Sequence, residues 1–420
     1  MATEKILAVQ EALPVPRPVP LWRNRDYLLL WSGQSISVIG TQVSHIALPL
    51  LILAFTGSPA QAGFVDGIAV VPYLLFCLLA GAMIDRWNRK KVMILCNLGL
   101  GLNMGSIAMA VVIGHLTMAQ LYLVSLIEGI LILFFETAQI ACLPRVVTAE
   151  QLPAAMAQNE ISNSLATLIG PAIGTALFQT LGSAVPFLSD AVSYLIAALS
   201  LVGIKTRFQG DRTAAPGRLH TEIVDGLKWL REHPLISFIA FLGSGANFVG
   251  TGKYLIVILL ARQLHAPLFA IGIIFSIAAS GDILGALIGG WLQQRLNFGH
   301  ALITISWLTA LVWPLYMVAP DFVILGIITA IISGLMQIFN IMQASYRLSL
   351  IPDELQGRVN SAFRLISYTG LMLGAASSGS LLQAIGTTST LLVFLACLLI
   401  MAIASTLNIH VRHAHTYSDS

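Results

Sequence analysis

Two acidic residues of this 420-residue chain lie well inside long apolar stretches, away from the ends of those stretches. Glu128 falls inside the stretch 118–141 and Asp282 inside 267–292. Placing an acid at the centre of a bilayer costs about 2.5–3.5 kcal/mol, so such a carboxyl pairs with a cation or takes up a proton. We expect Glu128 to be the main proton carrier and Asp282 a second candidate. The alternative is a static ion pair with a basic residue that also falls within an apolar stretch, namely Lys253 or Arg364.

Polar residues recur every three or four positions in four of the apolar stretches, which places each set along one side of a helix. Polar groups are costly in lipid, so these sides must face protein or water. We interpret them as the lining of one shared cavity. The alternative is hydrogen bonding between helices, worth roughly 0.6–2 kcal/mol per bond. The predicted cavity residues are Gln34, Ser37, Thr41 and His45; Tyr122 and Ser125; Asn247, Thr251, Lys253 and Tyr254; and Gln337, Asn340 and Gln343.

The composition indicates a membrane protein with many helices. Hydrophobic residues make up 57% of the chain, charged residues 10%, and the mean hydropathy is +0.84. A soluble chain has about 25% charged residues. We predict an all-α polytopic fold, because a spanning helix satisfies its own backbone. The expected spans, each of roughly 20 apolar residues, are 27–55, 61–84, 92–113, 118–141, 154–181, 183–204, 235–261, 267–292, 299–319, 321–345, 355–383 and 386–408.

A polar segment near residues 205–220 divides the spans into two similar halves. Glu150 and Gly170 of the first half align with Glu354 and Gly374 of the second, as expected for an internal repeat. An amphipathic helix is expected at 221–232, on the membrane surface or as part of a plain linker. The predicted parts are a disordered tail at 1–25, bundles of six helices at 26–204 and 234–408, a linker at 205–233 and a second tail at 409–420.

Lys and Arg are concentrated on one side of the predicted spans. Among the loops, the side opposite the two tails holds only Arg262. Cytoplasmic loops are enriched in Lys and Arg, so we predict that both termini are cytoplasmic. Asp66 and Asp190, near span ends on the opposite side, are expected to be solvated or to cap helices.

The loop between the second and third predicted spans contains Gly81, Asp85, Arg86 and Arg89. We expect Gly81 to allow close helix contact and the charged residues to form a gate, in which Glu136 pairs with Arg86 or Arg89. This G-x-x-x-D-R-x-x-R-K pattern resembles the signature of the major facilitator superfamily of secondary transporters. The resemblance implies twelve transmembrane helices in two pseudo-symmetric bundles, working by alternating access.

The fifth predicted span contains Gly170, Pro171 and Gly174, which resemble the G-P-x-x-G core of a motif in drug:proton antiporters. Trp31-Ser32-Gly33-Gln34, Leu143-Pro144-Arg145 and Asp190-Ala191-Val192-Ser193-Tyr194 resemble the macrolide-efflux and siderophore-export branch. The resemblance implies a proton-coupled exporter of amphiphilic molecules in a bacterial inner membrane, with multidrug efflux and antibiotic resistance as expected properties. The alternatives are an importer, a lysophospholipid transporter, and a transport-inactive scaffold or receptor.

Other function classes have little support in the sequence. One segment, Gly250-Thr251-Gly252-Lys253, partly matches a phosphate-binding loop but lacks its first glycine and its final Ser or Thr. We therefore expect that it does not bind ATP and that the protein is not an enzyme. Cys77, Cys96, Cys142 and Cys397 lack paired spacing, and we expect no metal or cofactor. The expected partners are a small amphiphilic substrate, protons and membrane lipid, without nucleic acid, and the protein is expected to be a monomer.

Overall fold

The computed structural model describes residues 20–206, 208, 228–293, 295–351 and 355–412. Its helices are α2 (Arg25–Thr56), α3 (Pro59–Arg86), α4 (Arg89–Ile113), α5 (Met118–Val146), α6 (Leu152–Leu181), α7 (Val185–Gly203), α9 (Pro234–Gln263), α10 (Leu268–Gln293), α11 (Phe298–Val312), α12 (Phe322–Leu350), α13 (Gln356–Leu407) and α14 (Ile409–Arg412). Two short 3-10 helices, η1 (Leu21–Arg23) and η2 (Trp313–Met317), complete the set.

Eleven helices in the described residues are long and apolar enough to cross a membrane. One of them, α13, has 52 residues. A straight helix of that length would measure about 78 Å, more than twice the roughly 30 Å hydrocarbon core. Gly386 interrupts it with φ 76° and ψ 176°, which are not helical angles, so α13 contains two crossings. The predicted all-α fold with twelve crossings is confirmed.

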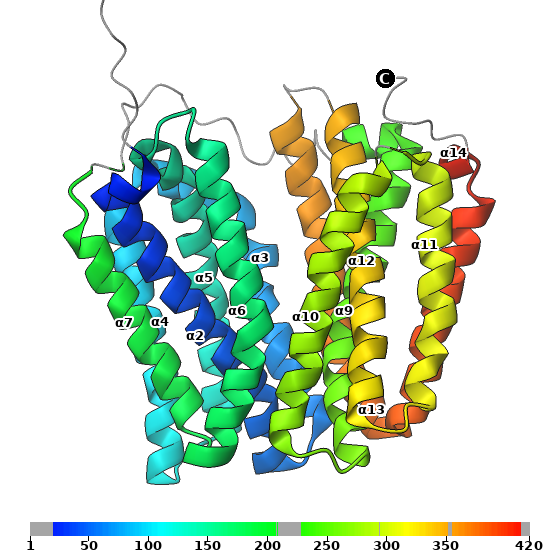
Figure 1. Ribbon diagram of the computed structural model, residues 1–420, viewed down its shortest axis with the longest axis horizontal. Helices are drawn as coiled ribbons and strands as arrows, with labels where there is room; N and C mark the ends of the chain where they lie inside the picture. The colour runs from blue at the N-terminus through cyan, green and yellow to red at the C-terminus, as the bar shows by residue number, and fades with distance from the viewer. Residues whose placement is uncertain (1–19, 207, 209–227, 294, 352–354, 413–420) are drawn as a thin grey trace, which may run out of the picture.

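The crossings form two bundles that stand side by side, α2 to α7 and α9 to α13 (Figure 1). The described chain enters the first bundle at Asn24 and leaves the second at Asn408, at the same end of the molecule. We call this end the termini face and the opposite end, with Gly57 and Gly386, the far face. Gly57 closes α2 with φ 68°, a left-handed conformation that favours glycine.

The two bundles touch closely in the half of the molecule next to the far face. A Cβ at Gly63 of α3 would lie 2.4 Å from the carbonyl oxygen of Ala375 in α13. Likewise, a Cβ at Gly272 of α10 would lie 2.4 Å from the carbonyl oxygen of Pro171 in α6. Only glycine allows backbones to approach this closely. These contacts hold the bundles together at the far face.

At the termini face the bundles stand apart (Figure 1). In the part of the chain that the structure describes, no heavy atom of a neighbouring segment lies within 4 Å of a Cβ built on Gly81 or Gly290. The predicted close helix contact at Gly81 is therefore absent from this conformation. The physical reason is that α3 meets α13 near Gly63 and diverges from it toward Gly81.

Both predicted tails are partly helical where the structure describes them. Residues 21–23 form η1, and the Asn24 side chain accepts a hydrogen bond from the Tyr27 backbone N–H to cap α2. At the other end, Ile409–Arg412 form α14, where a tail was predicted. Most of the predicted amphipathic helix at 221–232 lies outside the described residues, and residues 228–232 are helical.

Trp313 is the largest side chain that is fully buried in the second bundle. Its indole Nε1–H donates a hydrogen bond of 3.0 Å to the Leu391 carbonyl oxygen. We predict that Trp313→Ala lowers the free energy of unfolding by about 3–5 kcal/mol, because it leaves a cavity and an unpaired carbonyl. The measurement is the unfolding midpoint of purified protein in detergent. The control is Trp22→Ala at a side chain that is 73% exposed; equal midpoints for the two variants would contradict the assignment.

Candidate functional site

Two adjoining chambers occupy the first bundle and its boundary with the second. We call the first the amide chamber, with a volume of about 320 Å³, and the second the acidic chamber, with about 390 Å³. They share Thr41, Ile132 and Glu136 as lining residues. Because α2 starts at the termini face, its residues 34–42 place the amide chamber nearer that face, and residues 41–48 place the acidic chamber deeper.

The acidic chamber takes its acidic residues and its histidine from three helices. Glu128 and Glu136 come from α5, Asp66 from α3 and His45 from α2. Glu128 lies within electrostatic reach of Asp190 and of Asp66, and Asp66 lies within reach of His45. Two like charges in an apolar setting disfavour each other's ionised form. A chamber with this lining therefore favours the presence of a proton or of another cation.

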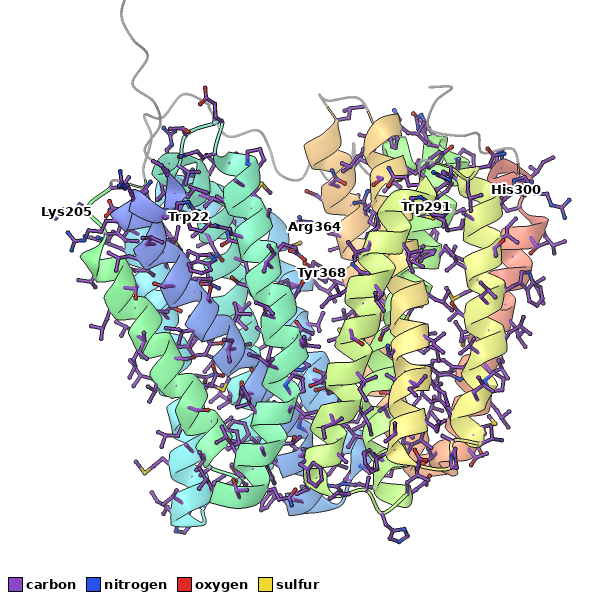
Figure 2. All side chains as sticks on the ribbon, in the orientation of Figure 1. Trp22, Lys205, Trp291, His300, Arg364 and Tyr368 are labelled. Atoms are coloured by element: carbon purple, nitrogen blue, oxygen red, sulfur yellow. The ribbon has the colours of Figure 1, made fainter. Side chains whose placement is uncertain are left out.

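Residues of the second bundle close the acidic chamber. Tyr368 of α13 lines it, with its ring centroid 5.0 Å from that of Tyr73 in α3. Figure 2 shows Tyr368 and Arg364 in the region between the bundles. Toward the far face, the His45 ring lies 5.2 Å from the ring of Tyr254 in α9. The chamber thus lies on the boundary between the bundles. A cavity must lie on this boundary if relative movement of the bundles is to expose it.

Asp190 lies in the interior of the first bundle, where the sequence predicted a solvated or capping residue. It is 0% exposed and accepts a hydrogen bond of 2.5 Å from the Ser44 hydroxyl and one of 3.3 Å from Ser193. Asp66 was predicted to be equally peripheral and instead lines the acidic chamber. Both predictions were wrong because they used only the position of each residue along its span. The hydrogen-bond partner of Asp190, for example, is 146 residues away in sequence.

Ser44 lines the acidic chamber and also donates to Asp190, so it joins the buried carboxyl to the cavity wall. We predict that Ser44→Ala lowers the free energy of unfolding by about 1–3 kcal/mol, because a buried acceptor loses its donor. Thermal unfolding in detergent measures this effect. The matched control is Ser200→Ala, whose hydroxyl donates only to Ile196 of its own helix among the described partners. An unchanged midpoint in the Ser44 variant would refute this role for the hydrogen bond.

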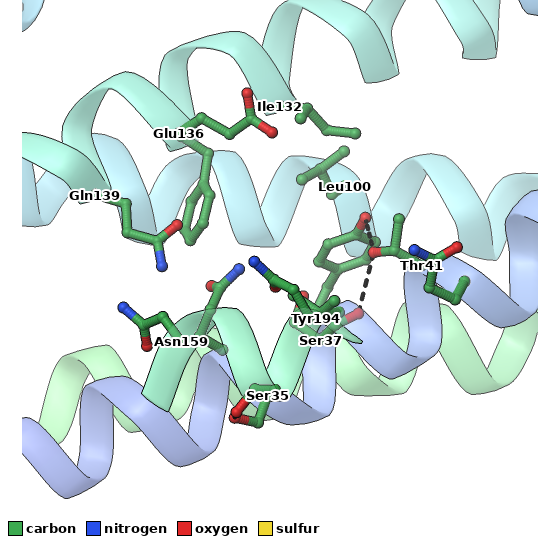
Figure 3. Close-up of a pocket in the computed structure, with 15 residues that line it drawn as sticks. Ser35, Ser37, Thr41, Leu100, Ile132, Glu136, Gln139, Asn159 and Tyr194 are labelled. Carbon is green, nitrogen blue, oxygen red and sulfur yellow. Dashed lines mark hydrogen bonds between the residues drawn. The ribbon is translucent and has the colours of Figure 1, made fainter. Parts of the chain in front are cut away.

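The predicted cavity residues of the first bundle mostly lie at the chambers. Gln34, Ser37 and Thr41 line the amide chamber, and the Thr41 hydroxyl lies 2.8 Å from that of Tyr194 (Figure 3). His45 and Ser125 line the acidic chamber. Tyr122 differs, because it packs against the apolar core.

The predicted residues of the second bundle contribute less. Thr251 and Tyr254 line a small chamber of about 40 Å³ next to His45 and Asp66. Asn247 donates to the Ser367 carbonyl oxygen at 3.3 Å, a contact between helices.

The α12 residues Gln337, Asn340 and Gln343 are absent from the lining of these three chambers, and among described atoms Gln343 Oε1 is buried without a hydrogen-bond partner. In this conformation the cavity therefore belongs mainly to α2, α3 and α5.

Asp282 and Lys253 belong to a separate cluster in the second bundle. Lys253 is buried and donates a hydrogen bond of 2.7 Å to the Ser333 hydroxyl. Asp282 lies within electrostatic reach of Lys253. This electrostatic interaction and the hydrogen bond to Ser333 connect α9, α10 and α12, and they favour a static pairing of Asp282 with Lys253, which was the predicted alternative to a proton carrier.

The predicted gate is arranged differently from the expectation. Glu136 accepts a hydrogen bond of 3.4 Å from Tyr73 and lies in the field of Arg364, where pairing with Arg86 or Arg89 was predicted. Arg89 donates to the Ala141 carbonyl oxygen at 3.0 Å. The Asp85 side chain lies outside the described part of the structure. Glu136 is therefore hydrogen-bonded within its own bundle and interacts electrostatically with Arg364 of α13 in the other bundle, an arrangement that sequence spacing does not reveal.

The glycines of the antiporter-like motif allow α6 to pack directly on α2. A Cβ at Gly170 would lie 2.4 Å from Cβ of Gln42, and one at Gly174 would lie 2.7 Å from the Val43 carbonyl oxygen. This packing places the polar side of α6 at the amide chamber. Asn159 and Asn163 of α6, with Gln139 of α5, line it and were not predicted. Asn159 and Asn163 are four residues apart, a helical spacing that places both on one side of α6 and is visible in the sequence.

Within the described residues, no group of three or more His, Cys, Asp or Glu side chains is arranged to hold a metal ion. The four cysteines are free thiols.

Twelve crossings in two bundles around a polar cavity define a polytopic membrane transporter of the major facilitator fold. The sequence pattern of the transmembrane secretion effector family matches residues 18–419, and the chain belongs to that family. The predicted superfamily and its export branch are thereby confirmed, and the family is one of transporters, not of enzymes.

Curated relatives and solved structures agree with this assignment. The chain is 24% identical over 348 residues to the enterobactin exporter EntS of Citrobacter koseri, covering 82% of each protein, and equally to EntS of Escherichia coli. Among solved structures it resembles the nucleoside transporter NupG, with a TM-score of 0.76, 14% identity and coverage of 91% of this chain and 98% of that one. It also resembles a bacterial homologue of the iron transporter ferroportin in an inward-facing state, with a TM-score of 0.73, 17% identity and coverage of 92% and 99%. The two structural likenesses show the shared fold alone.

Proposed function

We propose that this protein is a proton-coupled secondary exporter of amphiphilic small molecules, macrolide-like or siderophore-like, that works by alternating access. The observation that carries the proposal is the acidic chamber with Glu128, located where the two bundles meet. The similarity to enterobactin exporters supports the export direction.

Glu128 is the proposed proton carrier. Its carboxyl lines a chamber that also holds the carboxyls of Asp66 and Glu136, and His45 is the one basic residue of the described lining. Binding a proton relieves the repulsion among these carboxyls, and binding a substrate displaces water from the same space. Asp282 is less suited to coupling, because Lys253 already compensates its charge.

The proposed location is a bacterial inner membrane with the termini face toward the cytoplasm. This orientation in the membrane follows from the positive-inside rule, because Lys and Arg are concentrated in the loops on the side of the two termini. The open space beside Gly81 and Gly290 at the termini face then corresponds to an inward-open conformation, and the glycine contacts at the far face correspond to the closed periplasmic side. The protein is proposed to act as a monomer with lipid around it.

Transport by the purified protein in proteoliposomes tests this proposal. A labelled macrolide and a labelled catecholate siderophore are placed outside vesicles in which the termini face is outside and the lumen is acidic. We expect accumulation inside the vesicles, and its loss when a protonophore removes the gradient. Accumulation driven by the opposite gradient would indicate an importer. Movement of labelled lysophospholipid alone would indicate a lipid transporter, and no movement of any compound would indicate a scaffold.

A further inference from the structure

Carboxamide side chains are concentrated in the amide chamber. Gln34 of α2, Gln139 of α5, and Asn159 and Asn163 of α6 all line it. Gln139 and Asn159 are labelled in Figure 3. Within the described part of the chain, none of these four side chains makes a hydrogen bond to another residue. Each carboxamide offers two donors and an acceptor oxygen with two lone pairs. The chamber therefore presents many unused donors and acceptors in one place.

The neighbouring polar residues differ, because they already have partners. Gln42 donates to the Thr167 hydroxyl at 3.1 Å, and Ser35 donates to Ser162 at 3.1 Å. Ser162 also accepts a hydrogen bond of 3.0 Å from the Trp31 indole. These contacts fix the wall between α2 and α6. The four carboxamides are thus held on a rigid frame and left available for a ligand.

The charge of the chamber limits the ligands that it can hold. Its described lining contains no Lys or Arg, and its one ionisable carboxylate, Glu136, is bonded to Tyr73. An anionic head group needs a cation for strong recognition, typically the fork of an arginine. A cationic group would be drawn instead to Asp66 and Glu128 in the deeper chamber. A neutral group with many hydroxyls suits the carboxamides best, since each amide pairs a donor with an acceptor.

We propose that the amide chamber is a binding subsite for a neutral polyhydroxylated head group, such as a hexose. The apolar body of the same ligand extends into the acidic chamber, where Leu48, Val65 and Leu371 contribute to the lining. This inference rests on the proposed function, in that the ligand is the transported substrate. It narrows the substrate class to amphiphiles with a neutral sugar-like head.

Equilibrium binding to the full chain in phosphatidylcholine nanodiscs, without any gradient, tests the proposal. Three probes share an octyl chain: octyl β-glucoside, octyl phosphate and octyltrimethylammonium, each below its micellar concentration. Titration calorimetry compares loaded with empty nanodiscs. We expect the wild type to bind the glucoside about tenfold more tightly than the phosphate, because the glucoside gains two or more additional hydrogen bonds. Equal or tighter binding of octyl phosphate would overturn the proposal.

Variants separate the subsite from the rest of the cavity. The double variant Gln139→Leu with Asn159→Leu is expected to weaken glucoside binding about tenfold. Its affinity for octyltrimethylammonium should persist, which also shows that it is folded. The matched control Gln120→Leu removes a glutamine whose Nε2 bonds to the Ser106 carbonyl oxygen outside the chamber, and should leave glucoside binding unchanged. Undiminished glucoside affinity in the double variant would overturn the subsite. This binding assay has no proton gradient, so its outcome is independent of the transport assay. Absence of proton-driven transport would refute the proposed function without changing the binding result for the subsite.

Discussion

Glu128→Gln is expected to abolish the accumulation of substrate driven by a proton gradient. A proton that moves down 100 mV is worth about 2.3 kcal/mol, which sustains a roughly fiftyfold concentration ratio of substrate. Glutamine has nearly the same size and keeps hydrogen-bonding capacity but cannot take up the proton. The ratio across proteoliposomes carrying the variant should therefore fall to near one. The measurement is labelled substrate inside the vesicles at steady state.

Two controls make the Glu128 result specific. Exchange of labelled for unlabelled substrate without a gradient should continue in the variant, because exchange needs no net proton movement. Glu150→Gln, at an exposed residue outside both chambers, should retain gradient-driven accumulation. Undiminished accumulation by the Glu128 variant would remove this residue from the coupling role.

Gly379→Ala should prevent the bundles from closing at the far face. A Cβ there would lie 2.3 Å from the Pro59 carbonyl oxygen and 3.0 Å from Cα of Gly63, so backbone atoms of α3 and α13 must move apart. Overpacking of this kind costs about 1–3 kcal/mol, which shifts the balance between conformations by a factor of about 5–150. We expect a matching loss of transport rate, because each cycle passes through the closed far face.

Distances between spin labels test this shift. Labels at His115 and Thr388, exposed residues of the two bundles near the far face, report on their separation by double electron–electron resonance. The variant should populate longer distances than the parent. The matched control Gly105→Ala adds a Cβ that meets only Ala191 Cβ at 3.9 Å, an ordinary contact, and should keep the parent distribution. Identical distributions for the Gly379 variant and the parent would refute the role of this contact.

The fold was predictable because hydropathy acts locally. Each apolar stretch needs a helix of its own to satisfy its backbone, so span number and type follow from the sequence. The break in α13 at Gly386, for example, lies at the predicted boundary between the spans 355–383 and 386–408. The first and fourth spans also carried their polar residues at helical spacing, and most of these line the chambers.

The site was less predictable, because its contacts join segments far apart in the chain. The burial of Asp190 depends on Ser44, and the environment of Glu136 depends on Arg364 of the other bundle. Spacing along one helix gives the direction of a side chain only relative to its own helix. The α12 residues show this limit, because their spacing matches a polar stripe and yet they lie away from the described chambers.

The central claim is that one cavity is reached from the two faces in turn. Ile132 lines both chambers, so Ile132→Cys, in a protein whose four native cysteines are replaced, reports on that cavity. The measurement is its labelling by a membrane-impermeant maleimide applied to each side of sealed vesicles. We predict labelling from both sides, with Gly379→Ala slowing labelling from the termini face and speeding it from the far face. Labelling from neither side, or an unchanged ratio between the sides, would contradict this account.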